Sequence, residues 1–527
     1  AAPLTDDAGI AEFVTPLLPT CNFTDSIRVA ITNFGTDTLF SANIDWVINV
    51  TPMTTYNWTG ALPPFATDTV NLGFFPLATG DALNAISSMP NGSVENPAGA
   101  WNDAASIANL APGLNGIYTI GGITPDYATF AAAMTDINTF GLCGAVVFDI
   151  RDGVYNEQID LTSVLSDATN NITFRSENGD ASLVTLSYAG TSGTDNFVVN
   201  LNNTDYVSFE DLTLENSGLS FGSVVKVSGG SDYNRFEDCH MHTVANTSTS
   251  TNTAVLYSNN GKDNGNEFIN NIFEGGSYGA YWYGAGTSPT DLESGTVFDG
   301  NTFLDNYFYG ARFERQDAPM FIGNSFIGES TYTGSRYAMY INYCDNGFTA
   351  TDNNIYGSAT SSWRYGMYIL NCDATNVAHA TVANNMCQVG AIGNTSTFYA
   401  MYISNCGYTD IQHNSGYIID GGVSSRAFYG TSGGGNTLAN NIFATDSSGY
   451  AIYLGSNYTL ISSDNNLFHS PMGNVGYYGN ANQATLADFQ AASGLDANSV
   501  DMNPNFNSPY DLHVCNDSLK GLGMPLA

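Results

Sequence analysis

The sequence predicts an all-β protein, in which an N-terminal β-sandwich is followed by a right-handed parallel β-helix with a short capping helix. Three observations favour this fold class. A strand-like motif recurs with a period of about 28 residues, an asparagine recurs with it, and the inserts between the copies lack the apolar periodicity of a helix. A fixed period of about 20–50 residues is typical of architectures in which one repeat stacks on the next.

The clearest copy of the motif is YAMYINYC at residues 337–344. Close copies occupy residues 365–372 and 399–406, at steps of 28 and 34 residues. Side chains within a copy alternate with a period of two, which indicates a strand. Each turn of chain is therefore expected to form one rung, about 4.8 Å above the previous one. A leucine-rich repeat or a propeller fits less well, because their leucine and Trp-Asp patterns are missing.

An asparagine accompanies the repeat, mostly two residues before an aromatic side chain. On successive rungs these amides are expected to stack, to hydrogen-bond along the axis and to satisfy the backbone where the chain bends. The predicted structural ladder comprises Asn271, Asn301, Asn324, Asn354, Asn385, Asn414, Asn441 and Asn466.

Residues 1–111 are predicted to form a separate module. Short β-rich runs, for example at 27–32 and 42–50, are separated by turn signals, which is the pattern of an antiparallel sandwich. The runs at 7–10 and 26–39, together with Trp46 and the sequence WTG at 58–60, resemble the immunoglobulin-like modules of secreted Bacteroidetes surface proteins. This resemblance implies an immunoglobulin-like β-sandwich that acts as a spacer or a presenting module and carries no chemistry.

The β-helix is expected to occupy residues 116–527. A capping helix is predicted at about 125–138, with Thr124 as its N-cap and Pro125 at the first helical position. Such a helix would cover the apolar end that a β-helix otherwise exposes.

Two further stretches carry a resemblance. The sequence GVYNE at 153–157 resembles the first coil of pectin-active and related β-helix proteins, the pectate-lyase-like superfamily. Residues 503–513 resemble the terminal coil of secreted bacterial β-helix proteins. These resemblances imply an extracellular or cell-surface location.

The charge balance limits the partners. Twelve Lys and Arg against 49 Asp and Glu give a formal net charge of −37, which argues against nucleic acid and against an anionic membrane. No apolar stretch is long enough to span a bilayer, so no membrane insertion is expected.

Within the recurring motif, the third and fifth places are apolar and are expected to face inward, so the fourth place faces outward. The result is an exposed tyrosine stripe beside a groove of Gly or Ala at the second place. Tyrosine combines a flat apolar face with a polar tip, which suits contacts with sugar or protein. The alternative is a self-stacking ladder that stiffens the sheet, or a ladder that a long loop covers. The stripe consists of Tyr281, Arg312, Tyr340, Tyr368, Tyr402, Tyr429 and Tyr453.

Three of the eight cysteines, Cys344, Cys372 and Cys406, stand at equal places in the motif and are expected to stack. Adjacent rungs are about 4.8 Å apart, within the Cα–Cα range that a disulfide tolerates. Two alternatives stay open, a column of free thiols and one disulfide within it.

The resemblance to pectate-lyase-like proteins implies candidates for catalysis, because lyases of that group use an Arg or Lys base and its hydrolases use paired Asp. Arg336 and Arg364 precede the motif tyrosine at equal register, and Glu314 and Asp317 belong to an acidic and basic cluster one rung earlier. A cation beside carboxylates is suited to abstract a proton next to a sugar acid. The alternative is that these charges pair on a surface.

No cofactor is required by the sequence, and no metal ligand set is identified. Calcium is a candidate only because of the acidic composition. Four Asp-Ser/Thr-apolar triplets resemble the O-glycosylation acceptor pattern of Bacteroidetes, which implies modification at Ser26, Thr38, Thr69 and Ser518.

The preferred prediction is a non-enzymatic extracellular structural or adhesive protein, an adhesin or a subunit of a surface fibre. Its expected partners are an extracellular glycan or further copies of itself, associated head to tail or side by side through the sandwich or the tyrosine stripe. The alternative is a polysaccharide lyase or glycoside hydrolase of the β-helix class.

Overall fold

The computed structural model describes residues 4–16, 20–21, 26–94, 97–286, 288–328, 332, 334–358, 362–515 and 517–524. The chain forms two compact units, the first made of residues 1–116 with 135–146 and the second of residues 117–134 with 147–527. The predicted boundary at 111–116 lies close to the first of these divisions. Residues 135–146, which were predicted to belong to the β-helix, group with the first unit. Within the described ranges, no helix is both long enough and apolar enough to cross a membrane.

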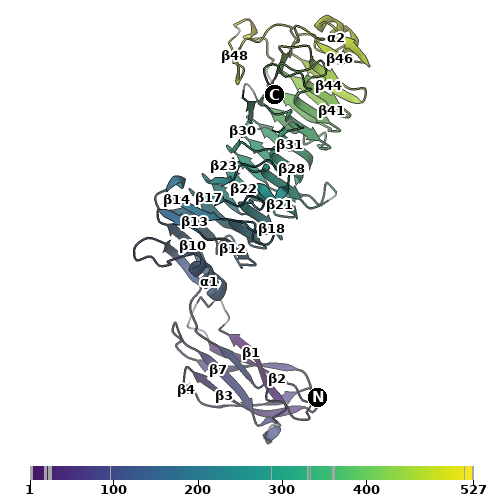
Figure 1. The fold of residues 1–527 in the computed structure, drawn as a ribbon. Coiled ribbons are helices and arrows are strands. Elements are labelled where there is room, and N and C mark those ends of the chain that lie inside the picture. The colour runs from purple at the N-terminus through teal and green to yellow at the C-terminus, as the bar shows by residue number, and fades with distance from the viewer. Residues whose placement is uncertain are drawn as a thin grey trace. The chain divides into compact units, whose positions relative to one another are not determined.

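The first unit contains two antiparallel sheets, one ordered β1-β2-β6 and one ordered β4-β3-β7-β8 with β5 beside β3 (Figure 1). Ile31, Ile44 and Trp46 lie in its buried core. The antiparallel sheets agree with the predicted sandwich, while an immunoglobulin-like topology stays a prediction. The strands are β1 (Ala8–Thr15), β2 (Ser26–Asn33), β3 (Leu39–Ile48), β4 (Thr51–Pro52), β5 (Tyr56–Leu62), β6 (Thr67–Phe74), β7 (Leu83–Ser88) and β8 (Ala104–Ile107).

A disulfide joins Cys21 to Cys143, with 5.3 Å between their Cα atoms and a sequence separation of 122 residues. The sequence analysis did not identify it, because the pairing of distant cysteines cannot be deduced from spacing alone.

The second unit is a right-handed parallel β-helix whose strands form three long sheets of 13, 12 and 14 strands in the described chain (Figure 1). Each rung contributes one strand to each sheet in turn, and successive rungs pair in parallel.

The first sheet comprises β9 (Leu114–Ile120), β10 (Leu142–Ile150), β13 (Ile172–Ser176), β16 (Val207–Glu210), β19 (Arg235–Glu237), β22 (Glu267–Ile269), β26 (Val297–Asp299), β29 (Met320–Ile322), β32 (Thr349–Thr351), β35 (Ala380–Ala383), β38 (Thr409–Gln412), β41 (Gly433–Ala439) and β44 (Tyr458–Asp464). The second sheet comprises β11 (Gly153–Tyr155), β14 (Val184–Tyr188), β17 (Thr213–Asn216), β20 (His240–Thr243), β23 (Ile272–Glu274), β27 (Thr302–Leu304), β30 (Ser325–Gly328), β33 (Asn354–Gly357), β36 (Met386–Gly390), β39 (Ser415–Ile419), β42 (Ile442–Thr445) and β45 (Leu467–His469).

The third sheet comprises β12 (Ile159–Thr162), β15 (Val199–Asn202), β18 (Val225–Ser228), β21 (Ala254–Gly261), β24 (Tyr278–Gly284), β28 (Tyr309–Asp317), β31 (Tyr337–Asp345), β34 (Tyr365–Leu370), β37 (Tyr399–Ser404), β40 (Arg426–Thr431), β43 (Tyr450–Leu454), β46 (Gly476–Tyr478) and β47 (Ala481–Gln483), with β25 (Glu293–Ser294) beside β28. A final antiparallel hairpin consists of β48 (Phe506–Ser508) and β49 (Asp511–Val514).

Phenylalanines at equal register fill the interior. Beneath the first sheet, neighbouring rings are nearly parallel and their centroids lie 4.6 to 5.5 Å apart. Their faces therefore cover one another, and the column is fully buried. Its members are Phe148, Phe174, Phe209, Phe236, Phe268 and Phe298.

An asparagine ladder stands at the turn between the first and second sheets. The side-chain Nδ2 and the backbone N–H of Asn301 both donate to Oδ1 of Asn324, each at 3.0 Å. The Nδ2 of Asn301 also donates to the carbonyl of Phe268 at 2.8 Å. The observed ladder is Asn271, Asn301, Asn324, Asn353, Asn385, Asn414, Asn441 and Asn466.

One predicted member of the ladder, Asn354, is wrong, because Asn353 takes its place. The prediction placed the asparagine two residues before the aromatic Tyr356. In this rung, however, the inward side chain is Ile355, which pairs with Phe326 below it. The ladder residue stands two places before the inward side chain, and that residue is Asn353.

The first helix, α1 (Phe130–Phe140), begins five residues later than predicted. Thr124 has a positive φ of 51°, so it is not the start of a helix. The backbone of Tyr127 instead bonds to Thr119 and Gly121, at 2.9 Å each, which holds residues before Phe130 in extended pairing.

Phe130, Met134 and Ile137 stand at the spacing of one helix face, and all three are buried. The second helix, α2 (Leu486–Ser493), follows a capping box between Thr485 and Asp488.

The ladder provides a first prediction. Asn353→Ala leaves both donors of Asn324 without their acceptor, so it should lower the free energy of unfolding by about 1–3 kcal/mol. Asn354→Ala, one residue away at the start of β33, should change it by less than about 0.5 kcal/mol. Urea denaturation of the full chain, followed by tyrosine fluorescence, measures both. Equal losses in the two variants would contradict the ladder assignment.

Candidate functional site

The outer face of the third sheet carries two columns of tyrosine. The first column occupies the first place of the motif, where ring centroids lie 4.6 to 5.0 Å apart and ring planes differ by 10° or less. The rings therefore cover one another's faces. Tyr278 and Tyr309 are buried, and the rings of Tyr337, Tyr365 and Tyr399 are half-buried. The column consists of Tyr278, Tyr309, Tyr337, Tyr365 and Tyr399.

The second column is the predicted tyrosine stripe, and it continues beyond Tyr453 to Tyr477, 4.1 Å away. Its rings meet the first column edge to face, as at Tyr337 and Tyr340, where the planes cross at 89°. The stripe is half-buried, because each ring packs against neighbours on its own rung and on the next. Burial raises the pKa of Tyr340 to about 12.

The self-stacking alternative therefore describes the packing, and the predicted small-residue groove is absent from the described face. The second-place residues Ala338, Ala400 and Ala427 are fully buried. A Cβ on Gly310 would lie 2.6 Å from the carbonyl of Ala338, so this place faces another backbone and requires a small residue. A binding role for Tyr281, Tyr340, Tyr368, Tyr402, Tyr429 and Tyr453 stays a prediction.

Two arginines belong to these columns. The guanidinium of Arg312 lies 5.4 Å from the ring centroid of Tyr281 and 5.3 Å from that of Tyr340, which fills the gap in the stripe. Its Nε donates to Glu314 at 2.6 Å. Arg426 lies 4.0 Å from the ring centroid of Tyr453. Glu314 is thus a structural partner of Arg312 within the stripe.

A pocket of about 220 Å³ opens where β28 and β31 end, and Arg315, Tyr343 and Asp345 line it together with Leu292. Arg315 lies 4.9 Å from the ring centroid of Tyr283. Asp345 is 6 % exposed and its Oδ1 accepts the backbone N–H of Asp373 at 2.7 Å. Burial raises the pKa of Asp345 above its ordinary value.

The backbone at this pocket is strained. Arg315 and Tyr343 have φ values of 58° and 52°, in the left-handed region that bulky side chains rarely adopt. The later rungs place Asn371 and Asn405 in the same conformation, with φ values of 50° and 53°, where asparagine tolerates it. Bulky side chains at such positions are enriched at functional sites, which makes this pocket a candidate.

The four catalytic candidates from the sequence lie in different places. Asp317 stands beside Asp345 in the register of β28 and β31. Arg336 precedes β31, at the opposite end of the strand, and is 1 % exposed. It donates to the carbonyls of Asn306 and Tyr307 and lies 4.2 Å from the ring centroid of Trp363.

Burial lowers the pKa of Arg336 to about 10. Because its side chain is enclosed, Arg336 ties loops together and has no access to a polymer. Arg364 lies on the next rung and is half-buried.

The stacked cysteines are free thiols. The backbone N–H of Cys344 donates to Sγ of Cys372 at 3.4 Å, and all three are buried. Of the two open alternatives, the structure has the thiol column, and Cys344, Cys372 and Cys406 form no disulfide.

The remaining candidates lie elsewhere. Thr69 and Ser518 are exposed, Thr38 is half-exposed, and Ser26 begins β2, so their O-glycosylation stays a prediction. In the part of the chain that the structure describes, no cluster of three or more His, Cys, Asp or Glu side chains is arranged to hold a metal ion.

Sequence reasoning missed Glu293, a fully buried carboxyl in β25, which pairs with the end of β28 at Gln316. Its Oε1 accepts Trp282 Nε1 at 2.5 Å and Thr296 Oγ1 at 3.2 Å. Burial, together with the neighbouring Asp263, raises the pKa of Glu293 to about 8. No periodic signal marks it, because β25 comes from an insert between β24 and β26.

No protein-family model and no curated protein matches the chain. Solved structures with the same general architecture do match. DFA-IIIase of Arthrobacter chlorophenolicus A6, without its lid and in complex with GF2, is 10% identical over 71% of this chain and 98% of its own, with a TM-score of 0.45.

The A-module of the mannuronan C-5 epimerase AlgE6 of Azotobacter vinelandii is 11% identical over 71% of this chain and 95% of its own, with a TM-score of 0.43. The Dettilon tailspike protein is 12% identical over 66% and 64%, with a TM-score of 0.42. These likenesses are too distant to carry an argument about function.

Glu293 provides a second prediction. Its folded-state pKa of about 8 exceeds the ordinary value of 4.5, so the folded state holds this proton more tightly than the unfolded state does. The resulting stability is complete below the ordinary pKa and is lost as the pH rises through about 8. Glu293→Gln should therefore remove a decline in the free energy of unfolding across that range.

Urea titrations at a series of pH values measure the slope for wild type and variant. Glu267→Gln, which removes a carboxylate from the outward face of the first sheet, is the matched control and should keep the wild-type slope. A Glu293→Gln variant with an unchanged slope would show that Glu293 titrates normally.

Proposed function

We propose that the third sheet binds an extended extracellular polysaccharide along the two tyrosine columns. The observation that carries this proposal is the continuity of the columns. Half-buried tyrosine rings recur on the rungs from Tyr281 to Tyr477, except on β28, where Tyr309 is buried and Arg312 takes the outward place, so a polymer of repeating units meets a similar side chain at nearly every step. A regular one-dimensional surface is suited to a regular one-dimensional ligand.

The distribution of positive charge supports the same face. The whole chain has only twelve Lys and Arg. Six of them lie on strands of the third sheet or directly before one, namely Lys226, Arg312, Arg315, Arg336, Arg364 and Arg426. On a protein with a formal charge of −37, these cations reduce the repulsion that a ligand with carboxylates would meet at this face.

A second candidate function is cleavage of that polymer at the pocket of Arg315 and Asp345. Its support is the buried carboxyl of Asp345, whose pKa is raised, beside Asp317 and an arginine. A carboxyl whose pKa is raised by burial is better suited to general acid or base catalysis than an exposed one. In this candidate site the basic residue is Arg315. Arg336, a basic candidate from the sequence, is enclosed.

Self-association through the sandwich or the stripe, a bound calcium ion and the cell-surface location stay predictions. Calcium would act on association by screening the acidic surface, which is a separate effect from polysaccharide binding.

The third prediction tests binding. Affinity electrophoresis in gels that contain neutral or acidic polysaccharides should retard the wild type. The triple variant Tyr340→Ser/Tyr368→Ser/Tyr402→Ser should bind at least about tenfold more weakly, because three consecutive rungs lose their contact surface. The control is Tyr206→Ser/Tyr233→Ser. These two tyrosines precede β16 and β19 of the first sheet, and their ring centroids lie 4.9 Å apart. Equal retardation of both variants would rule out the stripe as the binding face.

The fourth prediction tests cleavage. If the pocket is catalytic, wild type should release unsaturated or reducing ends from the bound polysaccharide, and Asp345→Asn or Arg315→Ala should lower the rate at least about a hundredfold. Arg175→Ala, which breaks a surface pair with Asp149, should keep the wild-type rate. Binding of the polysaccharide without release of unsaturated or reducing ends would show that the pocket is not catalytic.

A further inference from the structure

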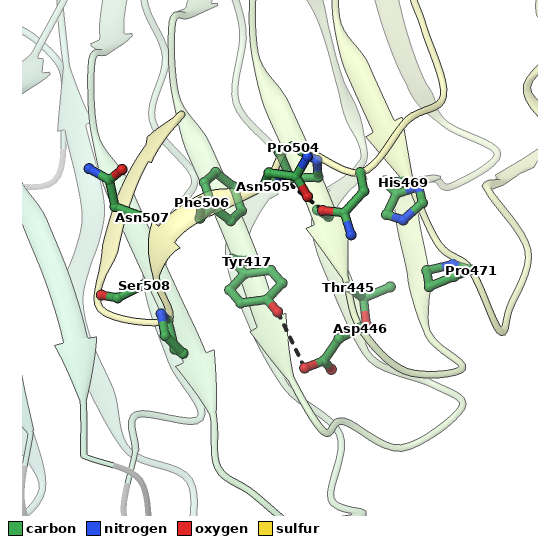
Figure 2. Close-up of a pocket in the computed structure, with 13 residues that line it drawn as sticks. Tyr417, Thr445, Asp446, His469, Pro471, Pro504, Asn505, Phe506, Asn507 and Ser508 are labelled. Atoms are coloured by element: carbon green, nitrogen blue, oxygen red, sulfur yellow. Dashed lines mark hydrogen bonds between the residues drawn. The ribbon is translucent and has the colours of Figure 1, made fainter. Parts of the chain in front are cut away.

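A second hollow lies on a different face of the β-helix. Its volume is about 360 Å³, and it lies, partly open to solvent, between the outward face of the second sheet and the chain segment 503–509 (Figure 2). Figure 2 shows Tyr417, Asp446 and His469 on the sheet side, with Phe506 and Pro504 on the segment that crosses over them.

The hollow exists because of one small side chain. Tyr417, Ala444 and His469 occupy the same register position on β39, β42 and β45. An alanine between two rings leaves a gap on the middle rung, so Tyr417 and His469 become walls and Ala444 the floor. The ladder fixes the rungs, and the gap is therefore part of the fold rather than a packing defect.

The roof is held in place. The Phe506 ring meets the Tyr417 ring edge to face, with 5.2 Å between centroids. The backbone N–H of Cys515 donates to the carbonyl of Asn505 at 3.3 Å, and β48 pairs with β49. Farther along, Asn440 donates to the carbonyl of Met524 at 2.9 Å. The cavity is thus preformed, as binding sites for small molecules usually are.

The polar groups of the cavity are hydrogen-bonding rather than cationic. Asp446 Oδ1 accepts the backbone N–H of Asp420 at 2.8 Å, and Oδ2 accepts only a long bond of 3.3 Å from the Tyr417 hydroxyl. Burial raises the pKa of Asp446. Asn503, Asn505 and Ser508 also line the hollow, and its lining includes neither lysine nor arginine.

These features exclude several kinds of ligand. An anion would face Asp446, and the imidazole in the lining, His469, already pairs with Asp501 at 2.9 Å. A purely apolar ligand would cover the same carboxyl without replacing its hydrogen bonds. Rings of Tyr417 and Phe506 beside a carboxyl and amides suit a ligand that combines an apolar ring face with hydroxyl donors.

The geometry points to a binding site for one neutral sugar ring, with Asp446 accepting hydroxyl protons and Ala444 providing the room. The cavity is at the small end of the range for ligand pockets, about 300–1,000 Å³, which fits a single ring. The site lies on the second sheet, so it does not depend on the tyrosine columns of the third.

The test uses the full chain and methyl glycosides of glucose, galactose, mannose and N-acetylglucosamine, with glucuronate and glucosamine as charged counterparts. Saturation-transfer NMR and calorimetry should show a neutral glycoside bound with a Kd on the order of 1 mM. Asp446→Asn should weaken it at least about tenfold because the amide accepts less strongly, and Ala444→Phe should abolish it by filling the hollow.

Two controls isolate the cavity. Ala383→Phe adds the same ring to the end of β35 on the first sheet, and Tyr340→Ser/Tyr368→Ser/Tyr402→Ser removes the stripe; both should bind like wild type. Circular dichroism checks that each variant is folded. If Ala444→Phe does not fold, Asp446→Asn still tests the cavity.

Three results would overturn the proposal. They are a wild type that binds none of the neutral glycosides, binding that survives Ala444→Phe, and tighter binding of glucuronate or glucosamine. Loss of binding in the stripe variant would also overturn it, while supporting the polysaccharide face on the third sheet.

Discussion

The hydrogen bonds of the asparagine ladder fix the register on which the second unit depends. From Asn301 to Asn466, each ladder oxygen accepts two donors from the preceding asparagine, and each Nδ2 also reaches a strand carbonyl, as Asn301 does with Phe268. A slip of one residue would break three bonds per rung and turn every inward side chain outward. The residue before each ladder position bends the chain with a positive φ, which Asn270 and Asn384 adopt readily. The ladder therefore sets both the turn and the vertical alignment.

Fixed register explains why the notable features of this unit are columns. Equal positions on neighbouring rungs must tolerate the same side chain at close spacing, so aromatic rings and thiols stack while a single exception creates a hollow. Ala444 between Tyr417 and His469 is such an exception. Arg315 and Tyr343 are a second exception. They adopt the left-handed backbone conformation at a position where the later rungs have asparagine. Departures from the repeat, rather than the repeat itself, mark the places where specific chemistry is available.

The repeat made the β-helix, its rung length and the inward columns predictable, since period and parity follow from the sequence. The error at Asn354 arose from choosing the aromatic Tyr356 as the inward residue. The pair Asp352-Asn353, a turn former followed by asparagine like Asn270-Asn271, carries the correct signal. The cavity was not predictable, because its roof comes from residues 503–509 and no local pattern states which face a terminal segment crosses. Glu293 was not predicted either, because it lies in an insert between two strands of the repeat, where the repeat sets no register.

Electrostatics gives a reason for the tyrosine columns that is independent of any ligand. Parallel register places like side chains about 4.8 Å apart, where like charges repel. On the first sheet, Arg235 pairs with Glu267 of the next rung and with Glu237 of its own strand, while Glu210 and Glu237 lie at equal register on neighbouring rungs. A chain with a formal charge of −37 has few cations left for this purpose, so the third sheet uses neutral phenols that stack at no electrostatic cost. Where a cation does enter, Arg312 bridges two rings and takes Glu314 as its partner. A surface that packing already requires is then available, in the same rings, for the proposed binding of a polysaccharide.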